Sequence, residues 1–183
     1  VSGQEGDAGQ LIFEFPVTVN GGIDAVQDIN FSFATQNGTA SVGDGDFAAV
    51  SGAGTIPAGS NSTVINVPVN GDEVPELDET FSVVLSNPSG ATITQGTGTG
   101  TIENDDTNSI SIADVSQSEG TGGQTVFVFT VSVDAGIALN TITFEVSTQD
   151  GTATVADQDY EPLDEVEGQI AQGETSTTLE VLV

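Results

Sequence analysis

The segment Thr35-Gln-Asn-Gly-Thr-Ala40 returns later in the chain as Thr148-Gln-Asp-Gly-Thr-Ala153, and this repetition decides the fold. A second pair keeps the same spacing, because Asp44-Gly-Asp-Phe47 returns as Asp157-Gln-Asp-Tyr160. The offset between copies stays at 113 or 114 residues along the whole chain. A constant period of this kind indicates an internal duplication, so we expect two units of the same fold.

Each unit is predicted to be all-β. Short runs alternate apolar and polar residues, are rich in β-branched and aromatic side chains, and are separated by turn clusters such as Asn20–Gly22, Ser51–Gly54 and Asn87–Gly90. This pattern is typical of a β-sandwich. The predicted strands are Leu11–Val19, Ile29–Ala34, Thr63–Val69, Phe81–Leu85, Ile110–Ile112, Thr125–Val133, Thr141–Ser147 and Thr177–Val183.

The two repeats differ in which strands they contain. We place the first repeat at residues 1–106 and the second at 107–183. Val1–Gly6 resembles Val115–Gly120, so the first repeat lacks the leading strand that Asn108–Asp114 gives to the second. Val183 aligns with Val69, so the second repeat has no counterpart of residues 70–105. We expect the missing strands to come from flanking sequence or from a neighbouring chain that adds a strand at an open edge.

The charge of the chain has one sign only. It holds 28 Asp and Glu residues and no Lys, Arg or His, which gives a net charge of −28. Repulsion among these groups opposes a compact state unless cations neutralise it. Nucleic acid is excluded as a partner, because phosphate binding needs Lys or Arg. There is no Cys and no run of about 20 apolar residues, so we expect neither disulfides nor direct membrane insertion.

The acidic residues gather in loops. Asp72–Glu79 holds five acids in eight residues, and Asn104-Asp-Asp106 ends the first repeat. A sandwich collects its loops at two ends, so acids from several loops can converge. Ca²⁺ takes six to eight oxygen ligands in flexible geometry and suits such loops, whereas softer metals prefer His or Cys. The alternative is that these loops are solvated turns, since no short calcium motif is present.

The ordered motifs identify a family. Glu-Gly, Phe-x-Phe-x-Val, Gly-Thr-Ala, Gly-Asp-x-x-x-Glu-x-x-Glu-Thr-Phe, Leu-Ser-Asn-Pro and Thr-Ile-x-Asn-Asp-Asp follow one another over residues 5–106, and those of the first part recur over 110–183. As a set, they resemble the Calx-beta family. The resemblance implies tandem immunoglobulin-like Greek-key β-sandwiches that bind several Ca²⁺ ions at one pole.

The resemblance also implies a set of calcium ligands. In the first repeat these are Glu5, Asp46, Asp72, Glu73, Glu76, Glu79, Asp105 and Asp106. In the second repeat only Glu119 and Asp159 match, because the later acidic loop has no counterpart. Asn104 stands where the family often has a third terminal Asp. Asp44 and Asp157 are either ligands or turn formers, and Asp78 is expected to be solvated.

The function expected from these features is a calcium-binding, extracellular or cell-surface structural or adhesive repeat. Calcium at Asp105 and Asp106 would stiffen the joint between repeats, and the partners would be calcium ions and neighbouring repeats or identical subunits, within a surface fibre or filament such as those of biofilms. The alternative is a calcium-sensing regulatory domain of a membrane transporter, as Calx-beta domains are in sodium–calcium exchangers. No enzyme is expected, because the acids match metal loops and no His, Lys, Arg or Cys could assist them.

Overall fold

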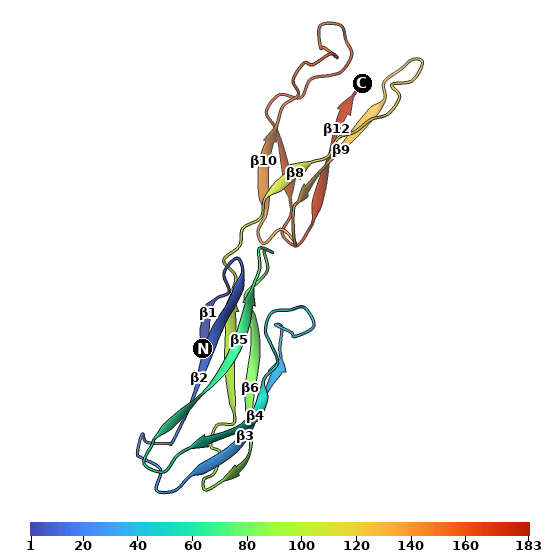
Figure 1. The fold of residues 1–183 in the computed structure, drawn as a ribbon. Helices are drawn as coiled ribbons and strands as arrows, with labels where there is room; N and C mark the ends of the chain where they lie inside the picture. The colour runs from blue at the N-terminus through green and yellow to red at the C-terminus, as the bar shows by residue number, and fades with distance from the viewer. The chain divides into compact units, whose positions relative to one another are not determined.

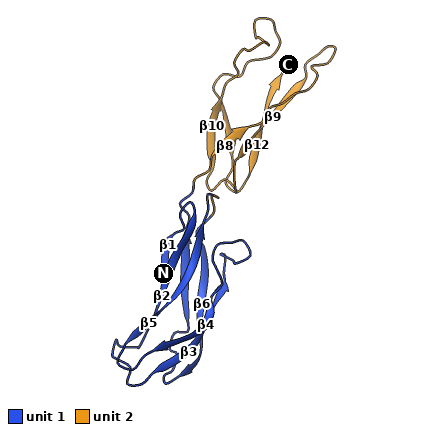
Figure 2. Cartoon of the chain, viewed as in Figure 1, with its two compact units in different colours: residues 1–73, 77–106 blue, residues 74–76, 107–183 orange.

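A computed structural model describes residues 1–183, which form strands and loops and no helix (Figure 1). No helix is therefore long and apolar enough to cross a membrane. The chain divides into two compact units (Figure 2): the first holds Val1–Glu73 and Leu77–Asp106, and the second holds Val74–Glu76 and Thr107–Val183. The all-β prediction is confirmed.

The first unit is a sandwich of two sheets. One sheet has the order β1-β7-β6-β3-β4 and the other pairs β2 with β5. All contacts in both sheets are antiparallel except that β1 runs parallel to β7. The strands are β1 (Ser2–Gln4), β2 (Gly9–Thr18), β3 (Ile29–Asn37), β4 (Ser51–Ile56), β5 (Ser62–Gly71), β6 (Glu79–Ser89) and β7 (Thr97–Glu103).

Phenylalanine rings form the centre of the first unit. Phe81 of β6 stacks on Phe47 with ring centroids 4.4 Å apart, and it meets Phe15 edge to face at 5.7 Å. Phe13 and Phe15 point inward because successive side chains of β2 face opposite sides of the sheet. The same alternation along β5 buries Ile65, Val67 and Val69 completely or nearly so. These aromatic and branched side chains give the unit a continuous core despite its acidic surface.

The second unit contains two small sheets with the orders β12-β9-β8 and β10-β11. Its core is correspondingly small: Val131, Val133, Ala138 and Ile170 are buried. The last strand of the second unit is β12, which pairs with β9. The strands are β8 (Ile110–Ile112), β9 (Val126–Val133), β10 (Ile142–Val146), β11 (Val166–Ile170) and β12 (Ser176–Leu182).

Two predicted turns are wrong. Ser51–Gly54 begins the strand β4, and Asn87–Pro88–Ser89 continues β6. In β4 the glycines serve packing: Gly54 lies opposite Phe31, and a Cβ at Gly54 would sit 2.4 Å from the Phe31 ring. The second unit repeats this device, because Gly168 lies opposite Phe144 at the same 2.4 Å. Glycine in a strand can therefore mark a close aromatic neighbour rather than a turn.

Candidate metal centre

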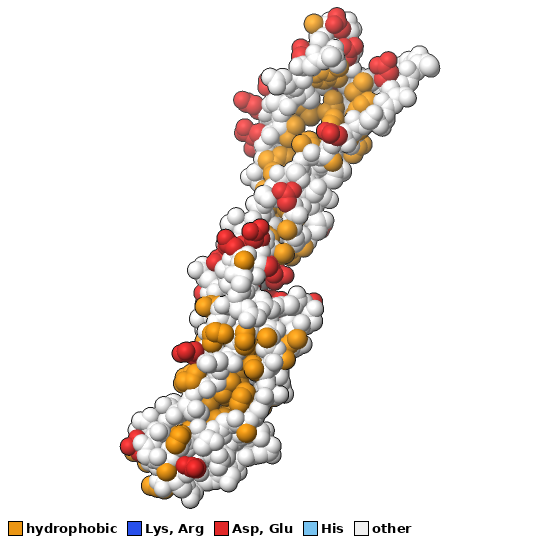
Figure 3. Space-filling model, viewed as in Figure 1, with side chains coloured by type: hydrophobic (Ala, Val, Ile, Leu, Met, Phe, Trp, Pro, Cys, Tyr) orange, Lys and Arg blue, Asp and Glu red, His pale blue; other side chains and the backbone are white.

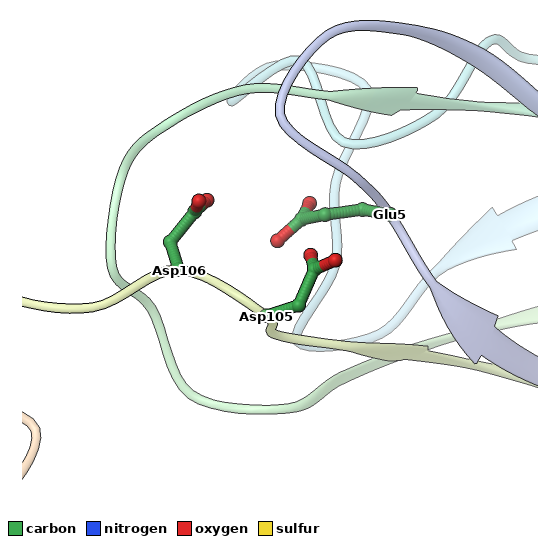
Figure 4. Close-up of side chains that lie close together, drawn as sticks. All are labelled: Glu5, Asp105 and Asp106. Carbon is green, nitrogen blue, oxygen red and sulfur yellow. The ribbon is translucent and has the colours of Figure 1, made fainter.

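Three predicted ligands meet at one end of the first unit. Carboxylate oxygens of Glu5, Asp105 and Asp106 all lie within 4.8 Å of one another (Figure 4). Glu5 follows β1, whereas Asp105 and Asp106 follow β7, so residues about 100 positions apart in sequence form one cluster. Glu5 and Asp106 are half-buried and Asp105 is exposed.

The parallel pairing of β1 with β7 creates this cluster. Ser2 lies opposite Thr101 and Gln4 opposite Glu103, so both strands deliver their next residues to the same end of the sheet. Hydrogen bonds continue past the strands, because the Glu5 N–H donates to the Glu103 carbonyl oxygen at 3.4 Å and the Gly6 N–H donates to the side-chain Oδ1 of Asp105 at 3.1 Å. The side-chain amide of Asn104 donates to the carbonyl oxygen of Asp106 at 2.9 Å and fixes the turn between them. Asn104 thus has a structural role here.

Asp106 carries the feature that marks the cluster as a binding site. Its Oδ2 atom is excluded from solvent and accepts no hydrogen bond from the protein. Burial raises the pKa of the Asp106 carboxyl above its ordinary value, and repulsion from Asp105, Asp7, Asp72 and Glu73 raises that pKa further. A solvent-excluded carboxylate oxygen without a donor is unfavourable unless a proton or a cation accompanies it.

A second acidic group lies in the same unit. The carboxylates of Asp46 and Glu79 have oxygens within 4.8 Å of each other. Asp46 is held in place by its loop, because the Ser41 N–H donates to Asp46 Oδ2 at 2.6 Å. Glu79 is the first residue of β6. Glu76, predicted to join them, belongs to the short segment Val74–Glu76 that groups with the second unit, and its role stays a prediction.

The remaining predicted ligands of the first repeat are Asp72 and Glu73. Both are exposed residues that follow β5, and both are near enough to raise the pKa of Asp106 by repulsion. The neighbouring Asp44 accepts a hydrogen bond from the Ser41 hydroxyl at 2.8 Å, which is a turn-forming contact. The loop after β5 therefore contributes negative potential to the Asp106 environment, and a direct ligand role for these two residues stays a prediction.

Two acids that were not predicted as ligands, Asp7 and Asp78, also have roles at this end. Asp7 adds to the repulsion that raises the pKa of Asp106. Asp78, expected to be solvated, accepts a hydrogen bond from the Asn104 N–H at 3.1 Å and so anchors the segment leading to Asp106. The position of Asp7, two residues after Glu5, was the only sequence signal that could have identified it.

In the second unit the two predicted ligands do not belong to a three-carboxylate cluster. Asp159 accepts a hydrogen bond from the Thr154 N–H at 2.8 Å, as its counterpart Asp46 does from Ser41. Asp157, the counterpart of Asp44, accepts a hydrogen bond from the Thr154 hydroxyl at 3.0 Å. The shared geometry shows that this loop conformation forms without the other acidic loops. Glu119 and Asp159 both line one pocket of the second unit.

Asp150 in the second unit is occupied by a different partner. The Tyr160 hydroxyl donates to Asp150 Oδ1 at 2.7 Å. This hydrogen bond lowers the pKa of Asp150, helped by a second bond from the Val155 N–H, and it raises the pKa of Tyr160. Asp150 is therefore a satisfied structural carboxylate, in contrast to Asp106.

The donor set of the first unit selects the type of cation. All its candidate ligand atoms are oxygens, and the chain has no His or Cys. Figure 3 shows the carboxylates in red with no basic side chain between them in this view. Hard cations prefer such ligands, and Ca²⁺ tolerates the irregular geometry of loop carboxylates better than Mg²⁺ does. The orphaned Oδ2 of Asp106 among other carboxylates fits a Ca²⁺ ion.

Comparison with known proteins shows which family the fold belongs to. The family model described as "Calx-beta domain" matches the chain twice, over residues 7–106 and 103–183. The chain belongs to the Calx-beta family. Among solved structures, it is similar to the calcium-binding domain CBD12 of CALX1.1, with 26% identity and a TM-score of 0.52 over 98% of this chain and 71% of that one. It is also similar to CBD12 from CALX1.2, with 26% identity and a TM-score of 0.51 over 100% of this chain and 72% of that one.

The family match supports the predicted tandem repeat and sandwich fold. Both CBD12 structures span the two Calx-beta repeats of this chain nearly end to end. The prediction of Calx-beta sandwiches in tandem is therefore confirmed. The CBD12 structure of CALX1.1 is that of a calcium-binding domain.

Proposed function

We propose that this chain is a calcium-binding regulatory module. The acidic end of its first unit binds Ca²⁺ and becomes more ordered as the calcium concentration rises. The observation that carries the proposal is Asp106 Oδ2, which is excluded from solvent, accepts no hydrogen bond and lies among other carboxylates. The calcium-binding domains to which the chain is similar support the same assignment.

Glu5, Asp105 and Asp106 are the residues that would hold the ion, and Asp46 and Glu79 are candidates for a second one. Bound calcium supplies positive charge where like charges otherwise repel. Glu5 brings the loop after β1 to the site, while Asp105 and Asp106 bring the segment after β7. Ion binding would therefore add a link between two chain segments that are otherwise joined at this end by the short β1–β7 pairing and by the Gly6–Asp105 hydrogen bond.

A calcium-sensing role attached to a membrane transporter is favoured over an extracellular adhesive role. The chain is similar to the calcium-binding domain CBD12 of CALX1.1, and the family resemblance implies sodium–calcium exchangers as its setting. In such a role the ion is a signal, so the calcium-free state must be populated and different. The carboxylate repulsion that raises the pKa of Asp106 also destabilises this end of the first unit when calcium is absent, which favours local opening there.

An extracellular structural repeat is the second candidate. One observation favours it: the chain has no Lys or Arg among 183 residues. Such a composition resists proteases that cleave after basic residues and suits a medium where calcium is always abundant. The two candidates differ in affinity, because sensors bind Ca²⁺ at about 10⁻⁷–10⁻⁵ M and extracellular modules at about 10⁻⁴–10⁻³ M.

Isothermal titration calorimetry of the metal-free chain with Ca²⁺ tests the proposal. Micromolar binding supports the sensor and millimolar binding the structural repeat. Asp106→Asn and Glu5→Gln are expected to weaken binding at least tenfold. Asp134→Asn is the matched control, because Asp134 of the second unit is held by the Ser109 and Ser111 hydroxyls and should not affect binding. Absence of heat and of any effect of Asp106→Asn would refute calcium binding at this end.

A further inference from the structure

The first unit contains three Asn-Gly pairs, at Asn20-Gly21, Asn37-Gly38 and Asn70-Gly71. In such a pair the backbone nitrogen of the glycine can attack the side-chain amide carbon of the asparagine and close a five-membered ring. Glycine makes this ring closure easy, because it has no side chain and rotates freely about its backbone bonds. The three pairs are alike in sequence, so their surroundings in the folded chain determine which of them reacts.

The pair Asn70-Gly71 is held rigidly at the end of β5. The Asn70 N–H donates to the Asp46 carbonyl oxygen at 2.9 Å, and the Asn70 side-chain oxygen accepts a hydrogen bond from Gln10 Nε2 at 2.9 Å. The glycine is packed against the main chain, because a Cβ at Gly71 would lie 2.0 Å from the Gly6 carbonyl oxygen. Neither the side chain nor the peptide can rotate without breaking these contacts.

The pair Asn37-Gly38, at the end of β3, is also restrained. The nitrogen that would attack is occupied, because the Gly38 N–H donates to the Ala40 carbonyl oxygen at 3.0 Å. The Asn37 side-chain oxygen accepts a hydrogen bond from the Val42 N–H at 3.3 Å. A Cβ at Gly38 would lie 2.2 Å from the Thr80 carbonyl oxygen, so this glycine is packed against backbone as well.

The pair Asn20-Gly21 lies in the turn after β2 and has none of these restraints. The turn is closed by one hydrogen bond, from the Gly22 N–H to the Val19 carbonyl oxygen at 3.0 Å. The Gly21 N–H donates to no acceptor of the protein, and the Asn20 side chain is exposed. A Cβ at Gly21 or Gly22 would have no atom within 4 Å. The attacking nitrogen is therefore free, and the peptide has room to rotate.

The second unit shows that this freedom belongs to the turn itself. Asp134 and Ala135 are the counterparts of Asn20 and Gly21 at the offset of 114 residues. Strand β8 lies beside that turn, because Ser109 and Ser111 donate hydrogen bonds to Asp134. Asp134 is nevertheless exposed, and the Ala135 N–H donates to no acceptor of the protein. An aspartate at this position is thus compatible with the fold.

We propose that Asn20-Gly21 is a site of spontaneous deamidation in the native chain. The Gly21 nitrogen loses its proton and forms a bond to Asn20 Cγ, while the bond from Cγ to the side-chain nitrogen breaks and ammonia leaves. Water then adds to one of the two ring carbonyls and gives aspartate or isoaspartate at position 20. Either product adds one negative charge to the turn. The isoaspartate form also lengthens the main chain by one methylene within the turn that the Gly22–Val19 hydrogen bond closes.

Peptide mapping of the full chain, aged in calcium at mildly alkaline pH, tests the proposal. A protease that cleaves after Glu and Asp is used, because the chain has no site for trypsin. It places the three pairs on separate fragments, residues 15–24, 29–44 and 47–72. Mass spectrometry follows the replacement of the amide NH₂ by OH. Fragment 15–24 is expected to react at least about tenfold faster than the other two, which corresponds to about 1.4 kcal/mol of activation free energy.

The matched control is the same chain aged in denaturant, where the three pairs should react at similar rates because their restraints are gone. Equal rates in the native chain, or a faster reaction of fragment 29–44 or 47–72, would overturn the proposal. The same lead of fragment 15–24 in denaturant would show that the fold does not select the site and would also overturn it. Isoaspartate in fragment 15–24, detected by an isoaspartyl methyltransferase, supports ring closure by Gly21, whereas aspartate alone would contradict that route.

Discussion

Calcium added to the metal-free chain is expected to stabilise the first unit and to leave the second unit nearly unchanged. One ion at a hundred times its dissociation constant adds about 2.7 kcal/mol to the free energy of unfolding. For a domain of about 100 residues, each kcal/mol raises the melting temperature by about 4–8 °C, so the rise is roughly 10–20 °C. The second unit has no three-carboxylate cluster of its own and serves as the internal reference.

The chain provides separate probes for the two units. Tyr160 is the only tyrosine, there is no tryptophan, and Tyr160 lies in the second unit, so its fluorescence reports that unit alone. Circular dichroism follows both units. Melts are recorded with chelator, with calcium, with the same concentration of magnesium, and with NaCl of matched ionic strength. Equal shifts of both transitions, or equal effects of magnesium and NaCl, would show that calcium acts by general screening and would refute a specific site.

Three further predictions follow from particular residues. Asp106→Asn removes a carboxylate whose pKa is raised by burial and repulsion, so melts in chelator should show a more stable first unit and melts in calcium a less stable one; the same sign in both would contradict the ligand role. Gly54→Ala forces a Cβ to 2.4 Å from the buried Phe31 ring and should cost the first unit about 1–3 kcal/mol in chemical denaturation, whereas Gly52→Ala, with its nearest atom at 3.5 Å, should change stability little. Asp134 and Asp150 have lowered pKa values, because Ser111 and Ser109 donate hydrogen bonds to Asp134, and Tyr160 and Val155 donate hydrogen bonds to Asp150. These two carboxylates therefore stabilise the second unit above about pH 3.8, and that stabilisation is lost as the pH falls through their lowered pKa values. Thermal melts followed by Tyr160 fluorescence between pH 6 and pH 2 should show the loss of stability, and the loss should be smaller in Asp134→Asn.

The sequence predicts the strands whose side chains alternate and misses those without that signal. Leu11–Val19 and Ile29–Ala34 alternate clearly and match β2 and β3 within a few residues. The strand β7, Thr-Gly-Thr-Gly-Thr-Ile-Glu, was not predicted, because glycine and threonine carry little hydrophobic pattern. Its glycines are required by the core, since a Cβ at Gly100 would lie 2.7 Å from the Phe81 ring. Packing against a partner strand, which a single sequence does not display, decided this element.

The candidate metal site likewise has features that the sequence predicts and features that only the structure shows. Family motifs predict Glu5, Asp105 and Asp106 as ligands, and the structure brings their carboxylate oxygens within 4.8 Å of one another. The motifs could not show that β1 pairs in parallel with β7, which is the contact that unites the two ends of the first repeat. Nor could they show that Asp78 and Asn104 have structural hydrogen bonds, because a carboxylate that anchors a backbone and one that faces solvent look alike in sequence.

Because all the charged side chains are acidic, each carboxylate must be screened by solvent, stabilised by hydrogen bonds or neutralised by a cation. Most carboxylates are exposed, where water and salt screen them at distances beyond about 10 Å. The carboxylates of Asp134 and Asp150 accept hydrogen bonds, from two serine hydroxyls at Asp134 and from the Tyr160 hydroxyl and the Val155 N–H at Asp150. Asp106 has no such donor at Oδ2 and faces four acids that raise its pKa. Because no side chain of the protein can supply a positive charge, compensation there must come from solution, as a proton or a metal ion. At neutral pH a proton is scarce, so a divalent cation is the compensation that the composition itself favours, and the stability of this end becomes a function of its concentration.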